Sequence, residues 1–153
     1  MAMKIIILED NEERRAAMRR CLDDRFYQYE ARFFDDAAEL IDYLRANLND
    51  TLVISLDHDL ELKPTPTGEM TDPGTGRDVA DYLARTAPVC PVVIHTTNSS
   101  AAVGMEMVLQ DAHWETRCVL PCDDLEWIPT QWFQSIRRAI VGPLRRSVEG
   151  RSL

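Results

Sequence analysis

The stretch TLVISLDHDLE, residues 51–61, runs from an apolar segment straight into two carboxylates and an imidazole. The first six residues predict a strand buried on both faces of a sheet, since such strands read as continuous hydrophobic runs. Asp57, His58 and Asp59 follow this strand without a break. Side chains that can bind a cation or move a proton are therefore expected at the carboxyl end of a buried strand.

Strand-like and helix-like segments alternate along the chain on both sides of this stretch. The expected strands cover residues 4–8, 29–34, 51–56, 91–95 and 116–120, and the expected helices cover residues 11–22, 35–48, 79–85, 99–112 and 129–144. Five strand–helix repeats predict one α/β domain with a doubly wound, five-stranded parallel sheet and helices on both faces. We expect this domain to span residues 1–144, because Gly142 and Pro143 are typical of a helix end, and residues 145–153 to form a C-terminal tail.

One long segment breaks this alternation. Residues 61–77, ELKPTPTGEMTDPGTGR, are rich in Pro, Gly and Thr and separate the third strand from the third helix. A loop of this length in a compact domain is usually functional or mobile. The segment is therefore predicted to be a functional or mobile loop that ends where residues 74–76 open the helix.

Composition limits the classes of function that the chain can have. Its 153 residues suit one domain with a full core, and 26 acidic against 17 basic residues give a formal net charge of −9. Such a surface repels nucleic-acid backbones, so general DNA or RNA binding is not expected. No long apolar span or signal peptide is evident, and the four cysteines have no zinc-like spacing. We expect a cytoplasmic protein with reduced cysteines and no membrane association.

Polar side chains follow three of the expected strands, and ligands bind at that edge of open parallel sheets. The residues concerned are Glu9 and Asp10, then Asp57, His58 and Asp59, then His95, Thr96 and Asn98. Carboxylates brought together repel one another, and Mg²⁺ or another divalent cation removes that repulsion. We interpret the four acidic residues as candidate metal ligands. His95 is the first candidate for proton transfer to a leaving oxygen and His58 the second.

Three residues at the start of the third helix add a candidate anion site. Backbone N–H groups at a helix start can bind an anion, and Gly74, Thr75 and Gly76 occupy that position. Together with Arg77, Thr96 and Asn98, they are the predicted phosphate-binding residues. A phosphate group beside a cation at the carboxyl edge of the sheet is therefore the ligand that the sequence favours.

The segment IIILEDNEERR at 5–15, followed by a strand that ends in an Asp, resembles the receiver domain of response regulators. This resemblance covers nearly the whole chain and implies a flavodoxin-like fold with strand order 2-1-3-4-5. In receivers, an acidic pair after the first strand and an Asp after the third hold Mg²⁺, and that Asp accepts phosphate. Glu9 and Asp10 match the pair, and Asp57 matches the acceptor. Thr96 is the closest match to the hydroxyl-bearing position after the fourth strand.

The chain departs from the receiver pattern after the fifth strand. Receivers carry a Lys-Pro pair there, whereas this sequence has Pro121 and Cys122. Lys63 and Arg77 are the nearest candidates to supply the missing positive charge, but neither is fixed by a strand. An ammonium group neutralises phosphoryl oxygens as charge builds on them, so its loss argues against ordinary phospho-signalling.

Three motifs that receivers lack resemble a divergent family described as cyclic-phosphate processing receivers. The motifs are Asp57-His58-Asp59-Leu60, Thr75-Gly76 and His95-Thr96-Thr97-Asn98. The resemblance implies a metal-dependent domain that processes a cyclic phosphate or phosphoester, with a small phosphorylated substrate as its partner. Two alternatives stay open at this point. One is a regulatory receiver that is phosphorylated on Asp57, and the other is a non-catalytic pseudo-receiver that binds a partner.

Overall fold

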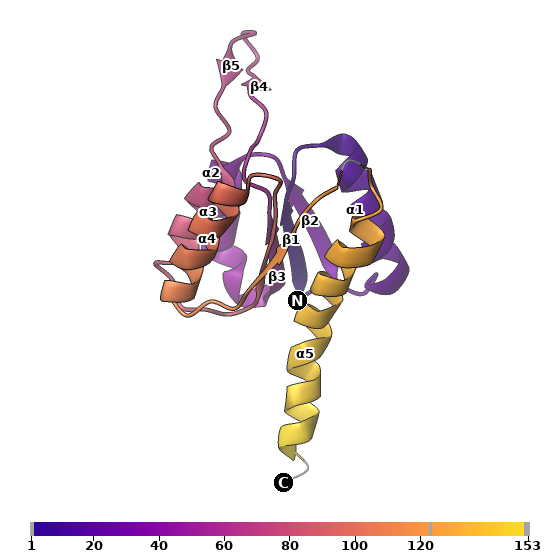
Figure 1. Ribbon diagram of the computed structural model, residues 1–153. Helices are drawn as coiled ribbons and strands as arrows, with labels where there is room; N and C mark the ends of the chain where they lie inside the picture. The colour runs from indigo at the N-terminus through magenta and orange to yellow at the C-terminus, as the bar shows by residue number, and fades with distance from the viewer. Residues whose placement is uncertain (1, 123, 152–153) are drawn as a thin grey trace.

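The computed structural model describes residues 2–122 and 124–151 and places the chain in three layers, helices on both sides of one parallel sheet (Figure 1). The strands of this sheet are β1 (Lys4–Leu8), β2 (Glu30–Phe34), β3 (Thr51–Leu56), β6 (Val92–His95) and β7 (Thr116–Val119). Their order across the sheet is β2-β1-β3-β6-β7. Counted along the chain as the five strands of this sheet, that is 2-1-3-4-5, so the predicted flavodoxin-like fold is confirmed.

Helices cover both faces because the central strands are apolar on both sides. The helices are α1 (Glu12–Arg25), α2 (Ala37–Asn47), α3 (Gly76–Leu83), α4 (Ser99–Asp111) and α5 (Phe133–Arg151), with a short turn η1 (Leu48–Asp50) and a π-helix η2 (Ile128–Trp132). In β1, Ile6 and Leu8 pack in the core beneath α2, α3 and α4, whereas Ile5 and Ile7 pack beneath α1, η2 and α5. This alternation is the period of two expected of a strand with two buried faces.

The register of the three central strands brings their carboxyl ends to one edge. Leu8 of β1 is paired with Leu56 of β3, which is in turn paired with Ile94 of β6. The residues that follow these strands therefore start side by side. The fold accordingly positions a site from segments that lie about fifty and ninety residues apart in the sequence.

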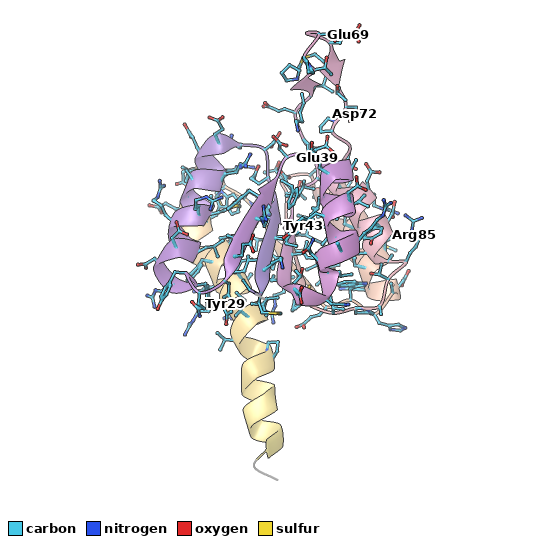
Figure 2. All side chains as sticks on the ribbon, turned by 180° about the vertical axis from the view of Figure 1, so that it is seen from behind. Tyr29, Glu39, Tyr43, Glu69, Asp72 and Arg85 are labelled. Atoms are coloured by element: carbon cyan, nitrogen blue, oxygen red, sulfur yellow. The ribbon has the colours of Figure 1, made fainter. Side chains whose placement is uncertain are left out.

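The long loop after β3 contains a small hairpin that the sequence did not predict. Its strands are β4 (Lys63–Pro64) and β5 (Met70–Thr71), paired antiparallel. The hairpin stands away from the sheet, with Glu69 at its far end and Asp72 nearer the body of the domain (Figures 1 and 2). Lys63 ties its base to the domain, because its Nζ lies 2.9 Å from Asp35 Oδ1 and 3.8 Å from Glu39 Oε1.

The last helix is longer than the sequence predicted. Gly142 and Pro143 were expected to end it, but α5 continues to Arg151. A proline crowds the Cβ of the preceding residue when that residue is helical. Gly142 has no Cβ, so part of this crowding is absent, and the helix continues past Pro143. Within the described residues, no helix combines the length and apolar character that crossing a membrane requires.

Candidate functional site

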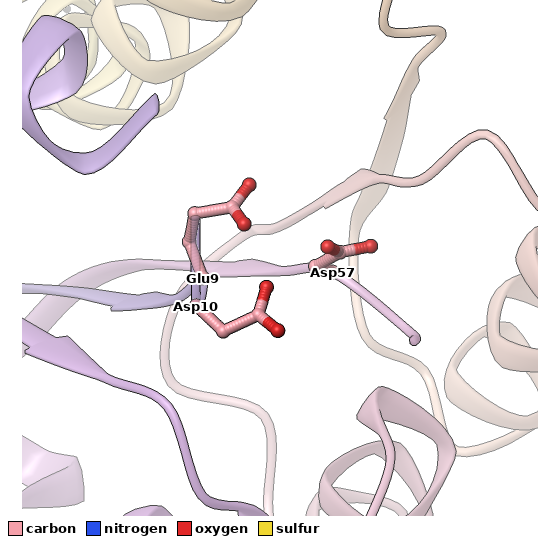
Figure 3. Close-up of side chains that lie close together, drawn as sticks. All are labelled: Glu9, Asp10 and Asp57. Atoms are coloured by element: carbon pink, nitrogen blue, oxygen red, sulfur yellow. The ribbon is translucent and has the colours of Figure 1, made fainter. Parts of the chain in front are cut away.

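Three carboxylates meet at the carboxyl edge of the sheet. Glu9 and Asp10 follow β1, Asp57 follows β3, and each offers an oxygen that lies within 4.8 Å of the others' (Figure 3). Glu9 is fully buried and Asp57 is 6% exposed, whereas Asp10 is half-buried. Access to the group is therefore from the side of Asp10 and Asp57, with Glu9 at its inner end.

Glu9 is held by groups that favour its charged form. Its Oε2 accepts a hydrogen bond from the Asn11 N–H at 3.1 Å, and its Oε1 lies 3.4 Å from His95 Nε2 and 3.6 Å from an Arg14 nitrogen. Burial works to raise the pKa of Glu9, but His95, Asn11 and Arg14 outweigh it and hold the pKa below its ordinary value. Glu9 is therefore the member of the group that is charged most readily.

The other two carboxylates are shifted in the opposite direction. Burial raises the pKa of Asp57 to about 6, His95 opposes this rise, and the nearby charge of Glu9 adds to it. Burial also raises the pKa of Asp10, although the Glu61 N–H donates to its Oδ2 at 2.6 Å. Two acids thus resist ionisation because their negative charges lack compensation.

This donor set fits a hard divalent cation. Carboxylate oxygens are the ligands that Mg²⁺ takes from proteins, usually one or two at a time with water and a ligand phosphate. Glu9 Oε1 is buried without a hydrogen-bond partner among the described residues, and such an atom is costly to leave unpaired. A cation held by Glu9, Asp10 and Asp57 would offset the repulsion between these carboxylates and lower the pKa values of Asp10 and Asp57.

His95 lies behind this group, not on its open side. Its side chain has no exposed surface, its Nε2 faces Glu9, and its Nδ1 lies 2.7 Å from Ser55 Oγ in β3. The ring stacks on Trp127 with 6.1 Å between centroids. The sequence predicted that His95 would exchange a proton with a substrate. The structure instead surrounds it with protein, because the strand residue that ends β6 still points into the core.

The exposed rim of the site is formed by the residues just after Asp57 and by the start of α4. Asp59 lies outside the three-carboxylate group and accepts a hydrogen bond from Asn98 Nδ2 at 3.2 Å. His58 is partly exposed, with its Nε2 3.9 Å from Asp59 Oδ1 and its buried Nδ1 without a partner among the described residues. The structure thus separates Asp59 from the other predicted metal ligands and places it with His58.

The predicted hydroxyl and amide positions act within the protein itself. Thr96 is buried and its Oγ1 accepts from the Asn98 N–H at 3.1 Å, which shapes the turn before α4. Asn98 Oδ1 caps α4 by accepting from the Ala101 N–H at 3.0 Å. Because Nδ2 holds Asp59, both ends of the Asn98 side chain already have partners.

The predicted anion site at the start of α3 is not supported. The N–H groups of Gly74, Thr75 and Gly76 donate in turn to Asp72 Oδ1 at 2.8 Å, Asp78 Oδ2 at 2.9 Å and the His58 carbonyl at 3.0 Å. Internal acceptors therefore satisfy all three donors, and two of these acceptors are carboxylates that would repel an anion. Gly76 instead permits a close approach, since a Cβ there would overlap the Asp57 carbonyl oxygen.

The cations that the sequence offered in place of the missing lysine lie elsewhere. Arg77 donates to Asp81 at 2.8 Å and lies against Gly104 of α4, and Lys63 pairs with Asp35. Arg14 does reach the site, because its guanidinium lies 3.6 Å from Glu9 Oε1 and 5.4 Å above the Trp127 ring. Sequence reasoning missed Arg14, since nothing distinguishes it from its neighbours in an arginine-rich helix.

Sequence reasoning also missed Ser55 and the role of Trp132. Trp132 is fully buried, and its Nε1–H donates to Ser55 Oγ at 3.0 Å. Ser55 could have been noticed as a hydroxyl within the buried run TLVISL, because a buried polar group needs a partner. No pattern in the sequence indicates that this partner lies 77 positions away.

Comparison with protein families gives one match, to the cyclic-phosphate processing receiver domain, over residues 4–111. Comparison with curated protein sequences gives no match. The matched segment contains all three carboxylates, both site histidines, and β1 to α4. It stops before β7, the strand after which receivers carry their lysine.

Comparison with solved structures places the fold among response regulators. The phosphorylated cyanobacterial phytochrome response regulator RcpA has 20% identity and a TM-score of 0.67, covering 92% of this chain and 95% of its own. The Mn²⁺-bound form of response regulator Rcp1 has 18% identity and a TM-score of 0.63, with coverages of 89% and 92%. The response regulator domain of Thermotoga maritima CheB has 12% identity and a TM-score of 0.62, with coverages of 92% and 97%. At these identities the likeness shows the fold alone.

Proposed function

Because the chain belongs to the cyclic-phosphate processing receiver domain family, we propose that it hydrolyses a cyclic phosphate or a related phosphoester with the help of a divalent cation. One observation carries the proposal. Three carboxylates from two neighbouring strand ends offer oxygens within 4.8 Å of one another, and the innermost of them, Glu9, is fully buried. Mg²⁺ is the expected cation, and Mn²⁺ would suit the same oxygen ligands.

The carboxylates have unequal parts in this proposal. Glu9, the acid that ionises most readily, anchors the cation from the inner end, and Asp10 and Asp57 complete the protein ligands from the accessible side. When bound, the cation withdraws charge from a phosphoryl oxygen and offsets the repulsion between an anionic substrate and this acidic protein. Without that offset, a net charge of −9 opposes the approach of any phosphate.

The bond changes are those of ester hydrolysis. A water oxygen forms a bond to phosphorus and releases one proton to solvent, one ester P–O bond of the ring breaks, and the leaving oxygen takes up one proton to become a hydroxyl group. His58 is the group that can deliver this proton, because it is partly exposed at the rim and its imidazole lies beside Asp59. Asn98 holds Asp59 in place, and His95 acts on Glu9 and not on the substrate.

The main alternative is a regulatory receiver in which Asp57 accepts a phosphoryl group. The position of Asp57 beside an acidic pair, in a fold shared with response regulators, favours this alternative. The described neighbourhood offers no lysine to the site, since Lys63 pairs with Asp35, and Pro121 and Cys122 follow the last strand. That absence favours hydrolysis over a stable phosphoaspartate.

The test is a screen for turnover by ³¹P NMR. The protein is freed of metal and then supplied with Mg²⁺ or Mn²⁺ together with nucleoside 2′,3′-cyclic phosphates or ADP-ribose cyclic phosphates. We expect at least one cyclic phosphate to be opened to a monoester, and Asp57→Asn and Asp10→Asn to abolish this activity. His58→Asn should lower turnover about 100-fold or more, the usual contribution of a general acid.

A matched control is available in His113, an exposed histidine that adopts a positive φ of 69° at the end of α4. Asn tolerates that conformation, so His113→Asn should leave turnover unchanged. Incubation with acetyl phosphate and Mg²⁺ addresses the alternative. A stoichiometric phosphoryl adduct on Asp57, with no turnover of any cyclic phosphate, would establish the receiver function in place of the proposed one. If the protein forms no adduct and turns over no cyclic phosphate, the remaining function is that of a non-catalytic pseudo-receiver.

A further inference from the structure

A line of buried polar side chains runs from Glu9 into the core of the domain. Its members are His95 at the end of β6, Ser55 in β3 and Trp132 in η2, none of which has any exposed surface. Trp132 Nε1–H donates to Ser55 Oγ at 3.0 Å, Ser55 Oγ lies 2.7 Å from His95 Nδ1, and His95 Nε2 lies 3.4 Å from Glu9 Oε1. Four elements of the fold thus contribute to one sequence of contacts that ends at the carboxylates.

The hydrogens in this line can be assigned from the side of Ser55. A serine hydroxyl has one hydrogen to donate, and an indole nitrogen can only donate. Trp132 therefore uses one of the acceptor positions of Ser55 Oγ. Among the described residues, the only other hydrogen-bond partner of Ser55 Oγ is His95 Nδ1. The Ser55 hydrogen thus has Nδ1 as its acceptor, and a proton on Nδ1 would leave the hydroxyl hydrogen buried without a partner.

The contacts on the far side of the imidazole lead independently to the same assignment. If Nδ1 accepts from Ser55, the proton of the neutral ring is on Nε2, which faces a Glu9 oxygen. With the proton on Nδ1 instead, a nitrogen lone pair would face that carboxylate oxygen, and both would repel. The two ends of the ring therefore favour the same tautomer.

An unusual turn of helix places the tryptophans around His95. The Trp132 N–H donates to the Trp127 carbonyl five residues earlier, at 2.8 Å, which is the bond of a π-helix. This wide turn brings the Trp132 indole to Ser55 and the Trp127 ring against the imidazole. Such turns are rare and frequently occur at functional sites.

We propose that Ser55 and Trp132 are positioning residues that fix His95 as the Nε2-protonated tautomer. In this state Nε2 has no free lone pair, so His95 cannot serve as a metal ligand through it. Its N–H instead faces Glu9 Oε1 at 3.4 Å and favours the charged form of that ligand. Partners of this kind orient metal ligands and raise metal affinity. The link to metal and turnover rests on the proposed function, whereas the tautomer is a property of the protein alone.

The test reads the tautomer directly, by long-range ¹H–¹⁵N NMR of the protein labelled at histidine and freed of metal. Wild type is expected to show His95 protonated on Nε2 with Nδ1 unprotonated. In Glu9→Gln the side chain that faces Nε2 no longer favours either tautomer, because an amide can donate or accept a hydrogen bond. We expect this single variant to retain the tautomer, since Ser55 and Trp132 still act on Nδ1.

The decisive variant is Glu9→Gln with Ser55→Ala. We expect this double variant to raise the ratio of Nδ1-protonated to Nε2-protonated His95 about fivefold, which corresponds to the loss of one net hydrogen bond. Glu9→Gln with Ser55→Thr keeps the hydroxyl and should restore the original ratio. Glu9→Gln with Trp132→Phe provides a second variant, expected to shift the ratio in the same direction. Trp127→Phe is the matched control, since it changes a tryptophan that stacks on the same ring but does not contact Ser55.

Two results would overturn the proposal. One is a wild-type His95 protonated on Nδ1, and the other is an unchanged ratio in both folded double variants. A chain that hydrolyses no cyclic phosphate would refute the proposed function while leaving the NMR result fully interpretable. Failure of the function and failure of the tautomer assignment are therefore distinguishable.

Discussion

Asp57→Asn should make the metal-free protein more stable at neutral pH. Asp57 is 6% exposed, and burial raises its pKa from 3.8 to about 6. Between these two pH values the unfolded chain has released a proton that the folded chain still holds, so stability falls as pH rises through this window. Asn carries no charge, and its oxygen can still accept the 2.7 Å hydrogen bond from the His58 N–H.

The magnitude follows from the shift. A rise of about two pH units corresponds to about 3 kcal/mol, which is the upper limit of the gain above pH 6. The buried amide that replaces the carboxyl costs part of this, so we expect a net gain of about 1–2 kcal/mol at pH 7.5. Near pH 4 the carboxyl is protonated in the folded wild type and about half protonated in the unfolded chain, so most of the gain seen at pH 7.5 should be lost.

Urea denaturation in EDTA at pH 4 and at pH 7.5 measures both quantities. Asp23→Asn is the matched control, because it removes the same charge from an exposed residue of α1. Saturating Mg²⁺ should then stabilise wild type and leave Asp57→Asn nearly unchanged, since only a ligand that binds the folded state adds stability. An Asp57→Asn protein that is no more stable than wild type at pH 7.5 in EDTA, or a gain that is equal at both pH values, would refute the reasoning.

Three further predictions concern the surroundings of the site. Gly76→Ala should cost at least about 1–3 kcal/mol in urea denaturation, because its Cβ would overlap a carbonyl oxygen in the loop after β3. Cys90 should react with a thiol reagent at pH 8 far more slowly than the exposed Cys122, since burial raises the pKa of Cys90 to about 12. Mass spectrometry of the labelled peptides measures which of the two cysteines is modified first. Lys63→Ala should change the free energy of unfolding by less than about 1 kcal/mol, as expected of a partly exposed ion pair, yet speed proteolysis within the hairpin, because the contact with Asp35 that holds its base is lost.

The fold was predictable because the signals that determine it are local. Each central strand is a short apolar run, and each run is followed by a helical segment, which leaves few arrangements other than a parallel sheet. The meeting of Glu9, Asp10 and Asp57 follows from the same logic. Once β1 and β3 are parallel neighbours, the residues after them must start at the same edge.

The errors arose where the outcome depends on contacts between distant side chains. The turn at residues 74–76 has the composition of an anion site, but Asp72 and Asp78 take up its N–H groups. His95 is the last residue of an apolar strand and Asp57 directly follows one, yet His95 points into the core, where Ser55 is its partner. No spacing in the sequence distinguishes a strand-end residue that faces solvent from one that faces the interior.

The opposite pKa shifts of Glu9 and Asp57 explain how one cluster can hold a cation and still be part of a stable domain. If the pKa of Glu9 were raised as the pKa values of Asp10 and Asp57 are, all three carboxylates would destabilise the fold when charged. The cation would then have to offset all three charges. Arg14 and His95 instead stabilise the charge of Glu9 from behind, so that an anionic ligand is present before any cation arrives. Below about pH 6, Asp57 can remain protonated until the cation lowers its pKa, and above that pH the cost of the empty site falls mainly on the acids at its accessible side. The surroundings of Glu9 therefore matter as much to the proposed chemistry as the carboxylates themselves, although no receiver motif in the sequence includes Ser55 or Trp132.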